Sequence, residues 1–213
     1  MLKALLLADL HGEYGMIESF MELAPDVVFI AGDITNMGTA QDVDTCFSRI
    51  DVPSFSVPGN CDPKEVLDAL ERSSSVNLHG STMNLGKISL VGIGGSNPTP
   101  FGTPFELTDK QIDDLLKGSV SKMERATHNV LISHAPPQGI LDEIAGNHVG
   151  SATVKKYVEK FDLICCAHVH EQRGIYEADG IKAVNPGPAA MGNCAMIHFG
   201  EDAKDIEIKL LNV

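Results

Sequence analysis

The chain has 213 residues, of which 43% are hydrophobic and 21% are charged, and these values are typical of one soluble globular domain. We therefore predict a single domain that spans residues 1–213. The formal net charge of −13 argues against an extended nucleic-acid-binding face, because such faces are built from clusters of Lys and Arg. It does not argue against a small phosphorylated substrate, since bound divalent cations would reverse the sign of the local charge.

Short apolar runs in the first part of the chain alternate with segments of helical periodicity, and these runs predict buried strands. The strands predicted in this way cover residues 2–8, 27–31, 54–57, 129–133 and 163–167. Helices are expected near residues 13–22, 39–48, 63–72, 108–117 and 151–160. For the third helix, Asp62 is a suitable N-cap and Pro63 suits the first helical position, while Thr108 and Gln111 form a capping-box pair at the start of the fourth.

The middle and the end of the chain are richer in short strands separated by turns, which is typical of hairpins. The additional strands predicted cover residues 76–78, 82–85, 88–93, 174–177, 181–184, 195–198 and 205–211. Two mixed β-sheets packed face to face as a sandwich and flanked by helices satisfy this order, so we predict an α/β fold of that kind. Two long irregular segments, 94–108 and 134–150, are expected to be either binding loops or plain surface excursions.

Cysteine usage and the N-terminal sequence indicate a protein of a reducing compartment. The chain has five cysteines, an odd number without a C-x-x-C pair, which predicts free thiols. The N-terminal apolar run is shorter than the core of a typical signal peptide and ends at Asp9, so a buried strand is favoured there. No run approaches the roughly 20 apolar residues that a transmembrane helix needs. We therefore expect a cytoplasmic protein without a membrane partner.

Polar side chains with metal-binding capacity follow five of the predicted strands. In open α/β sheets, ligand sites form beyond the carboxyl ends of the strands, so these side chains are expected to meet at one edge. Imidazole and carboxylate groups together suit divalent metals such as Zn, Mn, Fe or Ni. The candidate metal ligands are Asp9, His11, Asp33, Asn60, His134, His168 and His170.

The types and the spacing of these residues suit a pair of divalent ions. The two carboxylate oxygens of Asp33 can bridge two cations, and Asn60 offers a neutral carbonyl oxygen. The Asp-x-His and His-x-His motifs each place two ligands on one side of an extended chain. Glycines next to Asp33 and Asn60 permit tight backbone turns near the ions.

The motifs Asp-x-His, Gly-Asp, Gly-Asn-x-Asp, a strand-end His and a final His-x-His, in this order, resemble those of the calcineurin-like metallophosphoesterases. The resemblance extends from Asp9 to the turn at residues 185–187, with Ala167 where the family usually has Gly. Length and spacing are most similar to the small prokaryotic phosphodiesterase branch, and the implied fold is a β-sandwich flanked by helices. The implied ligands are Asp9, His11, Asp33 and His170 for one metal and Asp33, Asn60, His134 and His168 for the other.

One departure from the family pattern concerns the reaction itself. The family usually has Gly-Asn-His-Asp, whereas this chain has Cys61 in place of the His. The usual His contacts the phosphate and assists the leaving group, whereas a thiol is a weak hydrogen-bond donor without the imidazolium charge. The resemblance implies catalytic roles for Asn60, Cys61, Asp62 and His134, and the Cys favours phosphodiesters over phosphomonoesters.

We predict a dinuclear metal-dependent phosphoesterase that hydrolyses phosphodiesters by in-line attack of a metal-bridging hydroxide. Mn is the expected metal, with Fe, Zn, Ni and Mg as alternatives, and a small phosphorylated molecule such as a nucleotide is the expected substrate. Two other functions stay open, namely a phosphomonoesterase or nucleotidase with the same metals, and a non-catalytic scaffold similar to the retromer subunit of this fold. The complete ligand set disfavours the scaffold, and a homo-oligomer is compatible with the sequence.

Several residues near the motifs are open to two interpretations. His148 lies in the second irregular segment, where a solvated loop residue is favoured over one that faces the substrate. Arg173 follows the last His motif and is expected either to reach a phosphate or to lie on the surface. Cys165 and Cys166 lie within a predicted buried strand, so core packing is favoured over redox chemistry.

Overall fold

Two mixed β-sheets form the centre of the protein in the computed structural model, which describes residues 1–178, 180–202 and 205–213. Each has six strands within the described residues. The first sheet has the order β14 (Ile206–Asn212), β13 (Asn193–Phe199), β1 (Leu2–Leu7), β2 (Val27–Ala31), β3 (Ser54–Val57) and β4 (Val76–Asn77). The second has the order β11 (Gly174–Ala178), β12 (Ile181–Asn185), β10 (Leu163–Cys165), β7 (His128–Ser133), β6 (Ile88–Ile93) and β5 (Ser81–Leu85).

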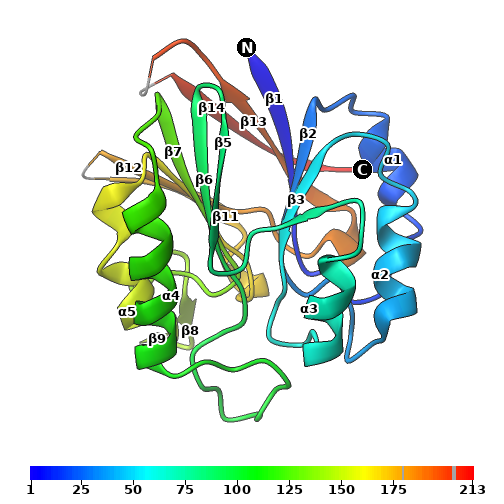
Figure 1. The fold of residues 1–213 in the computed structure, drawn as a ribbon, viewed down its shortest axis with the longest axis horizontal. Helices are drawn as coiled ribbons and strands as arrows, with labels where there is room; N and C mark the ends of the chain where they lie inside the picture. The colour runs from blue at the N-terminus through cyan, green and yellow to red at the C-terminus, as the bar shows by residue number, and fades with distance from the viewer. Residues whose placement is uncertain (179, 203–204) are drawn as a thin grey trace.

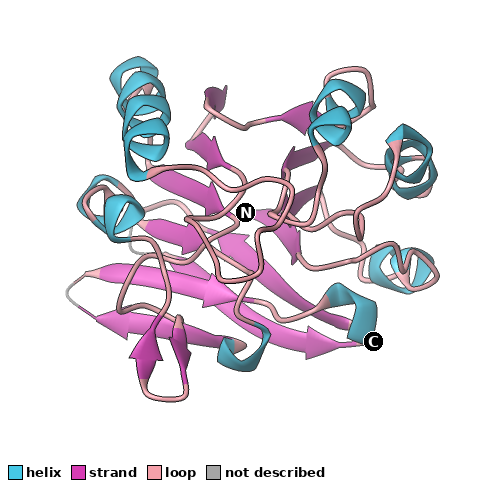
Figure 2. Cartoon of the chain, turned by 90° about the horizontal axis from the view of Figure 1, so that it is seen from below, coloured by secondary structure: helices cyan, strands magenta, loops and turns pink. Residues whose placement is uncertain are grey.

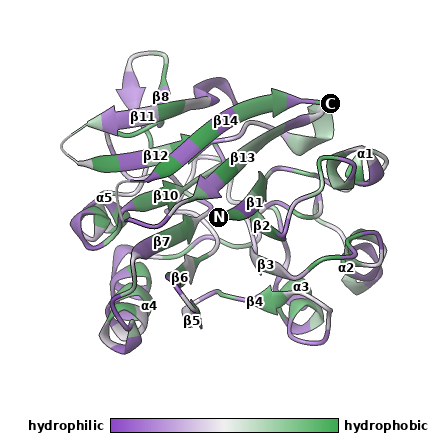
Figure 3. Ribbon diagram, turned by 90° about the horizontal axis from the view of Figure 1, so that it is seen from above, coloured by the Kyte–Doolittle hydropathy of each residue, from purple (hydrophilic) through white to green (hydrophobic). Residues whose placement is uncertain are grey.

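Helices cover the outer face of each sheet, so that the molecule has four layers (Figure 1). Figure 3 shows α1 to α3 beside the first sheet and α4 and α5 beside the second. The helices are α1 (Ile17–Met21), α2 (Ala40–Phe47), α3 (Lys64–Leu70), α4 (Asp109–Lys122) and α5 (Ala152–Lys155). The predicted α/β sandwich flanked by helices is therefore confirmed.

The alternation of side chains along the central strands explains why both faces of each sheet are apolar. In β1, Leu6 points into the core between the sheets, whereas Leu5 and Leu7 pack with the helices outside. In β7, Val130 faces the inner core and Leu131 the outer layer. Strands buried on both faces need continuous apolar runs, and those runs are the signal by which the sequence predicts them.

Several helix boundaries differ from the predicted ones. The helix α3 begins at Lys64 with Pro63 in the N-cap position and no side-chain cap, so the predicted capping role of Asp62 is wrong. Asp62 instead accepts hydrogen bonds from the neighbouring loops, which satisfy its buried carboxylate. The helix at Ser151 ends at Lys155, and a separate 3-10 turn follows.

The two predicted irregular segments lie across the carboxyl ends of the strands. Figure 2, a view from below, shows loops crossing the ends of both sheets with helices around the outside. The segment 134–150 contains a small hairpin formed by β8 (Glu143–Ile144) and β9 (Asn147–His148). Within the described residues, no helix is long and apolar enough to cross a membrane.

The imidazole of His79 anchors the start of the first irregular segment. Its Nδ1 accepts a hydrogen bond from the Gly94 N–H at 3.0 Å, and its ring meets Phe105 edge-on with 5.2 Å between centroids. Burial lowers the pKa of His79 to about 4, because a protonated Nδ1 could not accept this bond and the charge would be desolvated. The folded protein therefore holds His79 neutral well below the pH at which an exposed His is protonated.

This shift predicts a loss of stability in mild acid. Below about pH 6.5 the unfolded chain takes up a proton that folded His79 resists, so its contribution to stability falls as the pH falls from 6.5 towards 4. Between pH 7 and 5 we expect wild type to lose on the order of 1–2 kcal/mol more than His79→Gln in urea denaturation, since one pKa unit corresponds to about 1.4 kcal/mol. Other titrating groups affect both proteins alike, so equal losses would contradict this role of His79.

Candidate dinuclear metal centre

Five loops from both sheets deliver the predicted ligands to one place. Asp9 and His11 follow β1, Asp33 follows β2 and Asn60 follows β3, while the remaining three follow β7 and β10. Backbone hydrogen bonds connect the loops, such as those from His11 N to Asp33 O at 2.9 Å and from Ala167 N to His134 O at 3.0 Å. The parallel pairing of β1, β2 and β3 explains why their carboxyl ends meet.

Four of the predicted ligands have a left-handed backbone, which few residues other than Gly adopt. The φ angles are 53° at Asp9, 48° at His11, 49° at Asp33 and 70° at His168. Each such residue costs on the order of 1–3 kcal/mol and persists only where the surroundings hold it. Unfavourable backbone conformations concentrated at one site indicate that the loops are shaped for a function.

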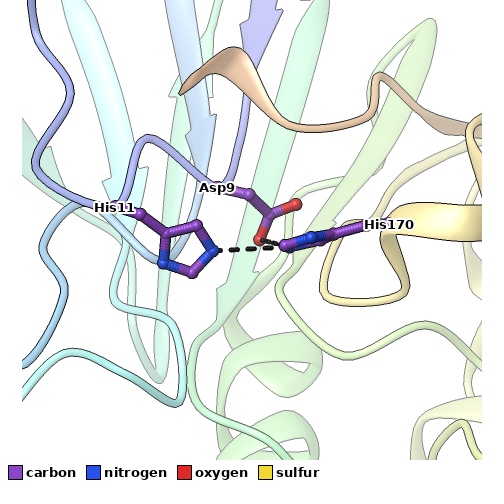
Figure 4. A group of neighbouring side chains, drawn as sticks. All are labelled: Asp9, His11 and His170. Atoms are coloured by element: carbon purple, nitrogen blue, oxygen red, sulfur yellow. Dashed lines mark hydrogen bonds and ion pairs between the residues drawn. The ribbon is translucent and has the colours of Figure 1, made fainter. Parts of the chain in front are cut away.

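Asp9, His11 and His170 form the first half of the centre, and Figure 4 shows Asp9 between the two imidazoles. The Nε2 atoms of His11 and His170 are 3.4 Å apart, and His170 Nε2 is 3.6 Å from Asp9 Oδ1. Asp9 is fully buried, and neither carboxylate oxygen has a hydrogen-bond partner among the described residues. A buried carboxylate without close donors is unfavourable unless a positive charge lies beside it, so this group fits a metal ion.

His134 and Asn60 provide independent support for a cation in the second half. His134 Nδ1 lies 2.8 Å from the Ala31 carbonyl, which can only accept, so this nitrogen carries the proton. Nε2 then presents a lone pair to Asn60 Oδ1, another acceptor, at 2.8 Å. His168 completes this half, with 5.1 Å between its ring centroid and that of His134. Two lone pairs that face each other are compatible with a shared cation and unfavourable without one.

Asp33 lies between the two halves and directs one oxygen to each. Its Oδ2 is 3.7 Å from His11 Nε2, and its Oδ1 is 3.5 Å from His134 Nε2. The Cys61 N–H also donates to Oδ1 at 2.8 Å, which fixes the orientation of the carboxylate. This is the arrangement that a bridging carboxylate requires, so the described residues fit a pair of divalent ions.

The charges in the centre influence one another strongly. Burial alone would raise the pKa of Asp9, but His170, His134 and His11 hold it below its ordinary value. Asp9 in turn raises the pKa of His170, whereas burial lowers that of His168 to about 4. His168 is thus ready to bind as a neutral ligand, whereas a metal must displace a proton from His170 in mild acid.

Cys61 and Asp62, both predicted as catalytic, have different environments. Cys61 Sγ lies with ligand atoms of His11 and Asp33 in a group whose members are all within 4.8 Å of one another. Burial, together with the charge of Asp33, raises the pKa of Cys61 to about 12, so the thiol is neutral. The carboxylate of Asp62 instead accepts from Gly59 N at 2.7 Å and Thr35 N at 2.7 Å. Asp62 therefore holds the loops that carry the ligands.

The pKa of Asp62 is raised to about 6, chiefly by burial and also by the negative charge of Asp33. Hydrogen bonds from Gly59 and Thr35 act in the opposite direction but do not offset this. Thr35 was not predicted, because a Thr after a Gly-Asp pair carries no distinctive signal. Its hydroxyl and its N–H both bind Asp62 Oδ1, at 2.8 and 2.7 Å. Only the spatial approach of two loops reveals this contact.

The structure shows the surroundings of His148 and Arg173, for which the sequence left two interpretations open. Asp142 is 1% exposed and accepts from His148 Nδ1 at 2.7 Å, so His148 is held in place. Arg173 Nε donates to the Pro186 carbonyl at 3.0 Å, which commits the guanidinium to a structural contact. Cys165 and Cys166 are fully buried in the apolar layers, as predicted.

A sandwich of two mixed sheets with this ligand set at its edge defines the metallophosphoesterase class. The family model for calcineurin-like phosphoesterases matches residues 2–172, and the chain belongs to this family. An uncharacterized protein of Methanocaldococcus jannaschii is 36% identical over 193 residues, which are 85% of this chain and 86% of that protein.

Two solved structures share the fold over almost the whole chain. One crystal structure has a TM-score of 0.80 at 20% identity, with 99% of this chain and 98% of the other covered. The protein TT1561 of Thermus thermophilus has a TM-score of 0.76 at 16% identity, with the same coverage of both chains. At such identities the two structures support the fold of this chain and say nothing of its substrate.

Proposed function

We propose that this protein hydrolyses small phosphodiesters with the aid of two divalent cations. A pair of Mn²⁺ ions is expected. The observation that carries the proposal is Asp33, whose two oxygens face histidines of opposite halves of the centre. Bound in this way, divalent cations would supply Lewis acidity and a water-derived nucleophile at neutral pH. In a scaffold that had lost activity, nothing would maintain seven side chains able to bind metal, four of them on residues with a left-handed backbone.

The choice of diesters rests on the lack of further positive charge. A phosphomonoester dianion benefits from Arg or Lys around its free oxygens, whereas a diester carries a single negative charge. No Arg or Lys among the described residues lines the pocket that adjoins His168, and Arg173 is bound to backbone carbonyls. Cys61, a neutral thiol, stands beside the ligands where an imidazolium would add charge.

Each residue has a task in this reaction that its environment supports. Asn60 and His134 would hold one cation, and the Ala31 carbonyl keeps the imidazole in the tautomer that binds a metal. Asp62 positions the loops of Asp33 and Asn60 through its buried hydrogen bonds. The protein therefore contributes chiefly by orientation, which suits phosphoryl transfer.

The first experiment compares bis(4-nitrophenyl) phosphate with 4-nitrophenyl phosphate as substrates of the purified protein. We expect the diester to be turned over faster with Mn²⁺, and the activity to vanish with a chelator and return on metal addition. Inactivity with Mn²⁺, Fe²⁺, Zn²⁺, Ni²⁺ and Mg²⁺, without metal retained on purification, would favour a scaffold. Faster turnover of the monoester would favour a phosphomonoesterase.

Replacing Cys61 by His tests the origin of the diester preference. An imidazole at this position would add charge and a proton donor for the monoester, so the diester-to-monoester ratio of kcat/KM is expected to fall at least about tenfold, a modest part of the range for general acid catalysis. Cys61→Ser, which adds neither charge nor an imidazole, is the matched control. An unchanged ratio in Cys61→His would remove this residue from the explanation of specificity.

A further inference from the structure

A cavity of about 460 Å³ adjoins the second half of the metal centre, and the proposed function uses only its lack of Arg and Lys. Both irregular segments contribute to it, and its volume is within the range of sites for small molecules, about 300–1,000 Å³. The residues that line it include Pro98, Pro100, Phe101, Ile144, His148 and the metal ligand His168. Its wall is therefore mostly apolar, and His168 connects it to the candidate metal centre.

Hydrogen bonds hold the two segments that form this cavity. Asn97 Nδ2 donates to the Val149 carbonyl at 3.2 Å, which connects one segment to the other. Glu106 accepts from Thr99 Oγ1 at 2.6 Å and from Thr103 N at 2.9 Å, which closes the loop around Phe101. Phe101 is nevertheless 85% exposed, so its ring is available for stacking against a ligand.

His148 and Asp142 form a pair at the same cavity. Asp142 Oδ2 accepts from Gly150 N at 2.9 Å while Oδ1 binds His148 Nδ1, so a buried carboxylate orients an imidazole that is itself half exposed. Because Nδ1–H donates to Asp142, Nε2 is the remaining nitrogen, and it has no hydrogen-bond partner among the described residues. A carboxylate that orients an imidazole is the arrangement used for proton transfer in catalysis.

We propose that this cavity binds the aromatic or heterocyclic alcohol part of a phosphodiester, and that His148 protonates the oxygen that leaves phosphorus. This inference rests on the proposed function and adds the substrate class and the proton donor. It supplies the function that Cys61 cannot perform, since the thiol is a weak donor. Asp142 is a positioning residue, because it acts only through His148.

The proposed step conserves atoms and charge. A water oxygen adds to phosphorus and its surplus proton goes to solvent. The bond between phosphorus and the alcohol oxygen breaks with its electron pair on that oxygen. His148 acts in its protonated form, in which Nδ1–H stays bonded to Asp142 and Nε2 gives its proton to the same oxygen. The products are a phosphomonoester and a neutral alcohol, and neutral His148 then regains a proton on Nε2 from solvent.

Leaving-group dependence separates proton donation by His148 from a structural role. With aryl methyl phosphates and Mn²⁺, we expect His148→Gln to lower kcat/KM at least about tenfold more for the phenyl ester than for the 4-nitrophenyl ester, because a good leaving group needs less protonation. Asp142→Asn should give a smaller effect of the same kind. An equal loss for both esters would indicate a structural role, and no loss would exclude His148; either result overturns the inference.

Binding of adenosine to the metal-free protein tests the cavity without turnover. In saturation-transfer NMR we expect adenosine signals with wild type and their loss with Phe101→Ala, because the base would lose the aromatic ring on which it stacks. Ile175→Ala removes an exposed apolar side chain from β11 and is the matched control, with binding retained. Absence of binding to wild type, or binding unaffected by Phe101→Ala, overturns the cavity assignment. Adenosine binding without hydrolysis of any ester would instead refute the proposed function and leave the cavity in place.

Discussion

Asp33→Asn is expected to lower phosphodiester hydrolysis more than about 100-fold, since changes to mere neighbours of metal ligands already cost about 10–100-fold. The reason is the position of Asp33, whose two oxygens face His11 and His134 at 3.7 and 3.5 Å. An amide nitrogen cannot replace a carboxylate oxygen as a ligand, so one cation would lose its bridge. The measurement is kcat/KM for bis(4-nitrophenyl) phosphate with saturating Mn²⁺.

The thermal stability of the same variant separates a lost metal site from a damaged fold. Metal that binds only the folded state raises the melting temperature, so wild type should melt at a higher temperature with Mn²⁺ than with a chelator. We expect Asp33→Asn to lose most of this difference while its metal-free melting temperature stays equal or rises, because one buried negative charge is gone. Asp51→Asn, an exposed change, is the control. A full metal-induced shift in Asp33→Asn would contradict the bridging role.

Gly59→Ala is expected to damage the metal centre, because it adds a methyl group where two of the ligand loops meet. A Cβ at position 59 would overlap Asp33 Oδ1 and also the Asp33 backbone nitrogen, which cannot move aside as a side chain can. The loops after β2 and β3 would have to separate, which would also break the bond from Gly59 N to Asp62. We expect a loss of about 1–3 kcal/mol in unfolding free energy, typical of overpacking, together with the loss of metal binding.

Gly118→Ala provides the matched control for this prediction. Gly118 lies within the helix α4, and a Cβ there meets nothing within 4 Å. Alanine in a helix is favoured over Gly by roughly 0.5–1 kcal/mol, so this variant should be slightly stabilised and fully able to bind metal. Urea denaturation and the metal content after dialysis measure both variants. Wild-type metal content in Gly59→Ala would show that the close approach of the two loops is dispensable.

Prediction of the fold succeeded where a strand is buried on both faces. The strands around β1, β2, β7 and β10 are central, so they require continuous apolar runs that are visible in one dimension. The prediction from sequence was wrong where tertiary contacts decide the local structure. Asp62 resembles an N-cap beside Pro63, yet the loops around Asp33 offer its carboxylate more hydrogen bonds than the helix end does.

The positions of the candidate ligands were predictable because each follows a recognisable strand, and the structure brings their side chains close together. The pair of Asp142 and His148 was not predictable, because an Asp and a His six residues apart in a loop have no regular geometry that relates them. The hairpin of β8 and β9 folds the segment back and places the two side chains 2.7 Å apart. Phe101 likewise acquires a role only from its neighbours in space.

The sequence by itself determined where the main strands lie along the chain, their apolar character and the chemical types at their carboxyl ends, because these depend on local patterns of hydrophobicity and on the identity of side chains. Only the tertiary structure decided how the ligands are oriented. The left-handed backbone at Asp9 and Asp33, the tautomer of His134 and the buried bonds of Asp62 each depend on contacts between loops distant in sequence. Such contacts leave no periodic trace in the chain, since they arise only when the two sheets pack together.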